Sequence, residues 1–436
     1  MPTRRQFINQ FAIAGTGALM LLKFDALARA NDAVQNTPPQ LSPSLTASDE
    51  DFWGRIQSAF EVDRSIINLN NGGVSPSPAS VSNALKQYID YSNKGPSYFM
   101  WRHLEPNIEL VREKLAKSFG VDKEEVAITR NASESLENVQ LGIPMNAGDE
   151  VITTTQDYPR MLTTWQQRAR RENIVIKKVS YKIPTNNFDE LLTKIEKEIT
   201  PRTKVIHVSH TIFLTGQIIP VKEISKIAHQ HGVLLICDGA HSFNHFPYKQ
   251  SDLDCDFFGT SLHKWTYAPI GTGFLYVRKE LIKNIWSLFA SDEKQENDIR
   301  KFEEIGTHPA ANHNAIAEAL AFNETIGIER KAERFRYLHG IWINRLRKYE
   351  NVKFLVNIDD PNQYCGIVNV HFEGTDPVKV VNHLLDKHKI FTVAIVHDEF
   401  KGIRVTPNVY TLVSEMEIFA DAMEKIAKGE VKDLGE

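Results

Sequence analysis

The sequence predicts an α/β fold: a large domain built on an open, mostly parallel sheet, and a smaller C-terminal α+β domain. Short β-like runs alternate with helical stretches between residues 125 and 277, which is typical of a parallel sheet covered by helices. The runs 204–208 and 233–237 are almost continuously apolar, as expected for strands with both faces covered. From about residue 312 the pattern changes to a long helical region followed by further strands, which favours a second domain.

The individual elements follow from hydrophobic periodicity. Strands of the large domain are expected at residues 125–129, 150–155, 174–179, 204–209, 233–237, 256–259 and 273–277. Its helices are expected from residue 134 and over 160–171, 188–199 and 221–231. In the smaller domain we expect a helical region over 312–349, strands at 352–356, 367–372, 391–396 and 402–405, and amphipathic helices at 377–387 and 415–428.

The first thirty residues have the organisation of a secretory signal. Arg4 and Arg5 form a twin-arginine pair, an apolar run covers residues 11–22, and residues 28–30 (Ala-Arg-Ala) offer a small-x-small cleavage site. The apolar run is shorter than the roughly 20 residues that a membrane span needs. We therefore expect export in the folded state by the twin-arginine route, to the periplasm or another extracytoplasmic space.

Three further regions follow this segment. Residues 31–50 are rich in Pro, Ser, Thr, Asn and Gln, which predicts a linker. Residues 51–311 are expected to form the large domain, with residues 51–80 as a segment near its functional site. Residues 312–436 are expected to form an interdomain helix and the small domain.

Composition excludes several classes of function. The 436 residues carry a formal net charge of −4, without a cluster of Lys and Arg that would suit nucleic acid or an anionic membrane surface. Cys237, Cys255 and Cys365 match neither a disulfide framework nor a zinc motif. The spacing of His241, His245 and Cys255 fits no common metal site either. We therefore expect no metal ion and no nucleic-acid partner.

Five predicted strand ends carry groups that can do chemistry. Ligands of an open α/β sheet bind outside the carboxyl ends of its strands, so these groups are expected to lie together. They are Asp238, Lys264, the helix start at Ala132 and Ser133, Tyr158, and His210.

This set matches the needs of pyridoxal phosphate. A carboxylate keeps the pyridine nitrogen of that cofactor protonated, and Asp238 is the candidate. A lysine amine with a lowered pKa binds its aldehyde, and Lys264 is the candidate. The N–H groups of a helix start suit its phosphate, and the flat side chain of Tyr158 suits its ring. The sequence therefore predicts pyridoxal phosphate as the cofactor, with Lys264, Asp238 and Tyr158 as catalytic residues.

The same residues stand in motifs that resemble a known family. Asp-Gly-Ala-His at 238–241 is followed by Ser-Leu-His-Lys at 261–264. This pair of motifs resembles the class V aminotransferase superfamily of fold-type I pyridoxal-phosphate enzymes, which includes cysteine desulfurases, kynureninase and isopenicillin N epimerase. The chain is most similar to the isopenicillin N epimerase-like members, from residue 68 to its end.

The resemblance implies roles around the cofactor ring. Asp238 would pair with the pyridine nitrogen, while Ala240 and Tyr158 would pack on the two ring faces. Either His210 or His241 would reach the ring hydroxyl. Many relatives have histidine at the Tyr158 position, where it also moves protons; a tyrosine still stacks, but its phenol is a poor base near neutral pH.

The resemblance also implies how the phosphate and a second subunit are arranged. Ser133, Ser261 and His263 would join the backbone at Ala132 around the phosphate. Thr307, in the segment 304–308, would reach the phosphate site of the partner in a homodimer.

Two residues are candidates for substrate binding. The resemblance places Arg404 at the substrate carboxylate, where the planar guanidinium suits a bidentate contact; a surface ion pair is the alternative for this arginine. Asn71, in the turn-like stretch 70–73, is a second candidate. The segment 391–404 contains no cysteine, unlike the corresponding loop of desulfurases, which argues against a persulfide route.

The reaction itself stays open at the level of sequence. The expected enzyme acts on an amino acid, or on an amino-acid side chain of an exported peptide. It works by removing a Cα proton, as class V aminotransferases do. An epimerase or a C–S or C–N lyase on the same scaffold is the alternative. A nicotinamide enzyme is disfavoured because no G-x-G-x-x-G motif follows an early strand. An exported ligand-binding protein without catalysis is the alternative from another class.

Overall fold

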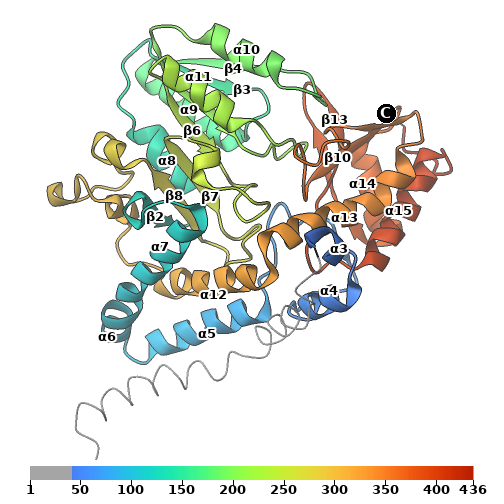
Figure 1. Ribbon diagram of the computed structural model, residues 1–436, viewed down its shortest axis with the longest axis horizontal. Helices are drawn as coiled ribbons and strands as arrows, with labels where there is room; N and C mark the ends of the chain where they lie inside the picture. Colours follow the sequence, from blue (N-terminus) through green and yellow to red (C-terminus); the bar gives the residue numbers. More distant parts are fainter. Residues whose placement is uncertain (1–41, 436) are drawn as a thin grey trace, which may run out of the picture.

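The computed structural model describes residues 42–435, in one large and one small domain (Figure 1). The predicted twin-arginine signal, at residues 1–30, lies outside the described residues, as does the part of the predicted linker at residues 31–41. Within the described part of the chain, no helix has the length and apolar character needed to cross a membrane.

A seven-stranded sheet forms the centre of the large domain, with the strand order β2-β8-β7-β6-β5-β3-β4. Only β8 runs antiparallel to its two neighbours, so the sheet is mostly parallel, as predicted. The strands are β2 (Val126–Thr129), β3 (Glu150–Thr154), β4 (Val175–Val179), β5 (Thr203–Ser209), β6 (Leu234–Asp238), β7 (Phe257–Ser261) and β8 (Gly273–Val277).

Helices cover both faces of this sheet, and the two apolar cores between them explain the continuously apolar strands. One core joins the sheet to α7 (Glu105–Phe119), α10 (Asp189–Glu198) and α11 (Val221–Gln230). The other core joins it to α8 (Ala132–Gly142) and α9 (Pro159–Glu172). Further elements of this domain are α5 (Ala79–Asn93), α6 (Pro96–Phe99), η1 (Met100–Leu104), η2 (Lys123–Glu125), η3 (Gln250–Asp252), η4 (Lys279–Asn284) and η5 (Glu293–Gln295).

The helical region predicted over 312–349 is two helices rather than one. Helix α12 (Ala310–Ile326) lies along α5 at the base of the large domain, and α13 (Ile328–Leu346) leads into the small domain (Figure 1). Gly327 separates them with φ of 84°, a left-handed conformation that favours glycine and cannot continue a right-handed helix.

The small domain is built on a four-stranded antiparallel sheet, as the sequence predicts for an α+β unit. Its strand order is β12-β13-β10-β9, and α13 packs beside α15 on its apolar core. The elements are β9 (Val352–Phe354), β10 (Val368–Phe372), α14 (Pro377–His388), β12 (Val393–Val396), β13 (Lys401–Val405) and α15 (Val413–Ala427).

The prediction of a linker up to residue 50 is wrong for its last residues. Short helix α3 (Pro43–Thr46) packs beside α13, and helix α4 (Glu50–Gln57) contacts α13 through Arg334, which pairs with Glu50. Asp49 caps α4 by accepting from the N–H of Phe52. Trp53 is fully buried and donates from its indole to the carbonyl of Thr46 at 2.8 Å. A single large aromatic therefore anchors a stretch whose polar composition resembles a linker.

The N-terminal segment then crosses to the small domain before it reaches the large one. Strand β1 (Ile67–Asn68) pairs in parallel with β11 (Ile390–Phe391). The N–H of Gly72 donates to Oγ1 of Thr406 at 3.0 Å. These contacts hold the segment 67–73 between the two domains.

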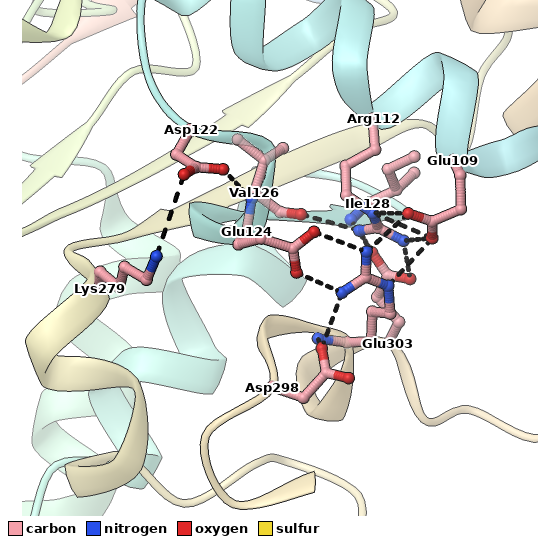
Figure 2. Close-up of polar contacts among 10 residues, drawn as sticks. Glu109, Arg112, Asp122, Glu124, Val126, Ile128, Lys279, Asp298 and Glu303 are labelled. Carbon is pink, nitrogen blue, oxygen red and sulfur yellow. Dashed lines mark hydrogen bonds and ion pairs between the residues drawn. The ribbon is translucent and has the colours of Figure 1, made fainter.

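A network of charged side chains ties the turn η6 (Ile299–Glu303) to the edge of the sheet (Figure 2). Arg112 is 1% exposed and binds Glu303, Glu109 and the carbonyl of Val126. The carboxylate of Glu303 also accepts from the N–H of Ile128, which lies on β2, the strand that pairs with β8. The network fixes where the segment 304–308, with Thr307, leaves the large domain.

Candidate functional site

A cavity of about 430 Å³ lies at the carboxyl ends of β3, β5, β6 and β7, between the two domains. The first turn of α8, the segment 72–73, and strands β12 and β13 supply its other walls. Ten of the residues predicted for the site line this cavity: Ala132, Ser133, Tyr158, Asp238, Ala240, His241, Ser261, His263, Lys264 and Arg404.

Lys264 follows the end of β7, and its amine lies 3.0 Å from Nε2 of His241. Burial lowers the pKa of Lys264 to about 8; Asp238 opposes this shift and Arg404 adds to it. Burial, with Lys264 nearby, also holds the pKa of His241 well below its usual range, so the imidazole is neutral and accepts the hydrogen bond from the amine. The site therefore contains an amine that loses its proton more readily than an ordinary lysine does.

Asp238 is the last residue of β6 and is 5% exposed. Its Oδ1 accepts from the N–H of Ala240 at 2.9 Å, which fixes the carboxylate against the floor of the cavity. Burial raises the pKa of Asp238 to about 6. A cationic ring nitrogen beside this carboxylate would favour its charged form and bring that pKa down again.

The start of α8 forms a second polar corner of the cavity. Asn131 caps the helix by accepting from the N–H of Glu134 at 2.9 Å, and the N–H of Ala132 donates to Oγ of Ser261 at 2.9 Å. Ser133 and His263 line the cavity beside them. The buried Nδ1 of His263 has no hydrogen-bond partner among the described residues, so an anionic group at this helix start would satisfy it.

Arg404 lies on β13 and is 7% exposed, which excludes the surface ion pair considered from the sequence. Its Nη1 donates to the carbonyl of Phe213 at 3.0 Å, and its Nη2 donates to Oδ1 of Asn70 at 2.9 Å. Its buried Nε has no hydrogen-bond partner within residues 42–435, and the partners of both Nη atoms are neutral oxygens. Burial lowers its pKa to about 10. A buried cation held by neutral groups favours an anionic ligand.

Of the two histidines considered for the ring hydroxyl, His241 lies in the cavity and His210 does not. Ser209 and Thr211 line the cavity. The ring of His210, between them, packs against Phe246 and Tyr248 at centroid distances of 5.3 and 4.8 Å. Because extended chain alternates its side chains, a residue between two that face the cavity points away from it.

Two other predicted residues also lie outside this cavity. Asn71 is fully buried and binds the carbonyl groups of Asn68 and Thr406 and the hydroxyl of Tyr410, so it shapes the turn while Gly72 and Gly73 line the wall. Thr307 is exposed and does not line the cavity of its own chain.

Sequence reasoning missed several residues that line the cavity. Phe213, Val393 and Ile395 form an apolar part of its wall, and Asn70, which does not line the cavity, orients Arg404 from behind. Val393 and Ile395 lie two residues apart on β12 and so share one face, but the run Val-Ala-Ile-Val is apolar throughout and does not indicate which face meets the cavity. Phe213 lies in a loop, where strand periodicity does not apply.

The turn between β12 and β13 closes over the loop that follows β3. Oε1 of Glu399 accepts from Oγ1 of Thr155 at 2.8 Å, and Nε2 of His397 lies 3.1 Å from the carbonyl oxygen of Thr155. The turn is short: His397 and Phe400, at its two ends, are joined by backbone hydrogen bonds. The three cysteines are buried, and none lines the cavity.

Comparison with known proteins adds the following. The sequence pattern of the family described as "Aminotransferase class-V" matches residues 67–395. An isopenicillin N epimerase from Amycolatopsis lactamdurans is 25% identical over 395 residues, or 86% of this chain and 99% of that protein. A probable cysteine desulfurase from Synechocystis is 30% identical over 300 residues, or 65% of this chain and 67% of that protein.

Solved structures share the fold. An apo cysteine desulfurase from Thermococcus onnurineus NA1 matches with a TM-score of 0.74 at 26% identity, over 84% of this chain and 95% of that chain. A cystine C–S lyase in complex with its product cysteine persulfide matches with a TM-score of 0.75 at 21% identity, over 86% of this chain and 99% of that chain. The predicted α/β architecture with a smaller antiparallel C-terminal sheet is therefore confirmed.

Proposed function

Since the chain belongs to the aminotransferase class-V family, we propose that it is a pyridoxal-phosphate enzyme that removes the Cα proton of an amino acid, free or within an exported peptide. One observation carries the proposal: Lys264, Asp238 and the start of α8 converge on one cavity. Three buried polar atoms there, Nδ1 of His241, Nδ1 of His263 and Nε of Arg404, have no partner among the described residues. These residues fit an anionic, nitrogen-containing ligand.

Each group has a part in holding the cofactor and the substrate. When bound, pyridoxal phosphate supplies an electron sink that stabilises the negative charge left on Cα after its proton is removed. Asp238 would hold a proton on the ring nitrogen, and Lys264 would bind the aldehyde carbon. The α8 start, with Ser133 and His263, binds the phosphate. Arg404 binds the substrate carboxylate through its planar guanidinium.

Lys264 is also the base that moves the proton. With its pKa lowered to about 8, a larger share of its amine is uncharged near neutral pH than in an ordinary lysine, and that uncharged amine would accept the proton. Nε2 of His241, 3.0 Å away, accepts a hydrogen bond from the amine and orients its lone pair. The atom to which Lys264 returns the proton decides the reaction.

Transamination, the activity after which the family is named, is the first candidate. Epimerisation is the second, because two isopenicillin N epimerases match along almost their whole length, 99% and 98%. A C–S lyase that uses a cysteine nucleophile fits less well, because Cys237, Cys255 and Cys365 are at most 1% exposed. A binding protein without chemistry would have no need of the Lys264–His241 pair.

Covalent mapping and product analysis test this proposal. Borohydride reduction of the purified holoenzyme, followed by peptide mapping, should place the cofactor on Lys264. The Lys264→Ala variant should keep the fold and lose the covalent bond, because it removes one amine and leaves the phosphate corner unchanged. Label on another lysine would refute the assignment. Incubation with L- and D-amino acids, with and without a 2-oxo acid, separates transamination from epimerisation.

The active unit is proposed to be a homodimer, in which Thr307 reaches the phosphate site of the partner. Its exposure outside its own cavity is consistent with that role. A hollow of about 440 Å³ exposes the apolar side chains of Ile66, Val74, Ile270 and Phe391 near the segment 67–73. Exposed apolar groups gathered in this way mark an interaction surface. Sedimentation of the holoenzyme measures the oligomeric state.

A further inference from the structure

We propose that the substrate carries an apolar, uncharged side chain that binds against a wall formed by Phe213, Val393 and Ile395. We refer to these three residues as the apolar wall. This inference rests on the proposed function, since it takes the substrate to react at Lys264 and to bind Arg404 through its carboxylate.

The apolar wall lies directly beside Arg404. Val393 lies directly opposite Arg404 in the register of β12 with β13. The backbone carbonyl of Phe213 accepts a hydrogen bond from Nη1 of Arg404, so the residue that carries the aromatic ring is in direct contact with the guanidinium. The ring of Tyr158 packs edge-on against that of Phe213 at a centroid distance of 5.3 Å and extends the apolar surface. A substrate carboxylate on Arg404 therefore brings the side chain of the same Cα towards this surface.

The charges that line the cavity leave nothing for a charged substrate side chain to pair with. Among the described lining residues, the basic side chains besides two histidines are Lys264 and Arg404, and the acidic one is Asp238. Burial lowers the pKa of both histidines, His241 and His263, which favours their uncharged form. Lys264, Arg404 and Asp238 already have a partner in the proposed chemistry. A second carboxylate or an ammonium group would lose its water against apolar carbon without a partner, which is unfavourable. A methylene chain in the same place would gain from burial.

The apolar wall is fixed in place rather than adaptable. Ile395 is 6% exposed and belongs to the main core of the large domain, and Phe213 and Val393 pack against that core. The turn beyond β12 is fastened to Thr155 by Glu399 and His397. A wall that packs on the core and is fastened beyond the end of β12 resists moving aside to uncover polar groups for a different substrate.

Binding of a matched series of amino acids to the holoenzyme tests the inference. The visible absorption of the bound cofactor is titrated with norleucine, glutamine, glutamate and lysine, and each dissociation constant is determined from the spectral change. Norleucine should bind at least about tenfold more tightly than glutamate or lysine, because burying a charged group without a partner is unfavourable. Glutamine should bind with intermediate affinity, and because it has nearly the size of glutamate, the comparison of these two isolates the effect of charge. Glutamate or lysine binding as tightly as norleucine would overturn the inference, as would a band that no member of the series changes.

A pair of variants on one strand separates the apolar wall from a general charge effect. Val393→Lys places an ammonium group on the wall and should shift the norleucine-to-glutamate preference at least about tenfold towards glutamate. Val396→Lys adds the same charge at a position that is 70% exposed and does not line the cavity, so the preference should change less than about twofold. Equal shifts in both variants would overturn the inference, and the wild-type series decides it if Val393→Lys does not fold. Failure of the proposed function is read separately, as absence of the cofactor band before any amino acid is added.

Discussion

Lys264 lies in surroundings that should make cofactor attachment depend on pH in a defined way. The neutral amine is the form that bonds to an aldehyde, and burial lowers its pKa from 10.5 to about 8. The rate of attachment to the apoprotein should therefore rise with pH and level off above about pH 8. Rapid-mixing absorbance measurements between about pH 6 and pH 10 check this. A rate that still rises steeply at the upper limit would indicate an unperturbed lysine.

Arg404 is expected to contribute to substrate binding and not to cofactor binding. A bidentate, charge-assisted contact contributes about 1.5–3 kcal/mol, so Arg404→Ala should lower kcat/KM by about one to two orders of magnitude. Arg404→Lys should recover only part of this, because an ammonium group cannot form the planar contact. The spectrum of the bound cofactor should be unchanged in both variants.

A carboxamide analogue of the substrate provides the control for Arg404. The wild type should prefer the acid over the carboxamide strongly, and Arg404→Ala should lose that preference. If the mutant keeps the preference, the carboxylate binds elsewhere.

Single residues were predictable where a motif and a strand end coincide. Asp238 ends one buried strand, Lys264 comes shortly after another, and both line the cavity. His210 follows its strand by the same rule, yet it packs against Phe246 on the other side, because side chains alternate and a shift of one residue reverses the face. Sequence patterns place the end of a strand less finely than that.

At the scale of elements, the charged network in Figure 2 predicts a difference between two carboxylates that bind arginines. Glu303 is 11% exposed and pairs with Arg112, which is 1% exposed. Glu303→Gln should reduce the free energy of unfolding by about 2–3 kcal/mol, somewhat less than for a pair with no other partner, because Glu109 still binds the arginine.

The control for Glu303 is Glu124, which binds Arg300 in the same network but is 40% exposed. Glu124→Gln should reduce the free energy of unfolding by less than about 1 kcal/mol, because water screens this pair. Urea unfolding of both variants measures the difference. Similar losses would contradict the importance assigned to burial here.

Elements were predictable where periodicity is strong. The seven strands of the large sheet lie within a few residues of their predicted positions. The antiparallel direction of β8 was not predictable, because a buried apolar run looks the same in either direction. Helices α3 and α4 were missed because their polar composition hides the contacts of Trp53 and of Arg334, which donates to the carbonyl of Ala47.

At the scale of the whole molecule, the twin-arginine pair predicts where the protein functions. We propose export in the folded state, with the cofactor collected beforehand. Replacing Arg4 and Arg5 with Lys should leave the protein in the cytoplasm with its N-terminus uncleaved, because the receptor of this route reads the pair. Cell fractionation and N-terminal sequencing check this. Normal export of the double variant would indicate a different route.

The contact between the segment 67–73 and the small domain has a consequence for how the protein is made. Gly72, which lines the cavity, bonds to Thr406 across 334 residues of sequence. The ribosome therefore releases this part of the wall early, and it has no place to dock until almost the entire chain has emerged. A nascent or prematurely terminated chain could form much of the large sheet, but its cavity would stay open on that side. Retention of the cofactor would then report that synthesis had run through β13.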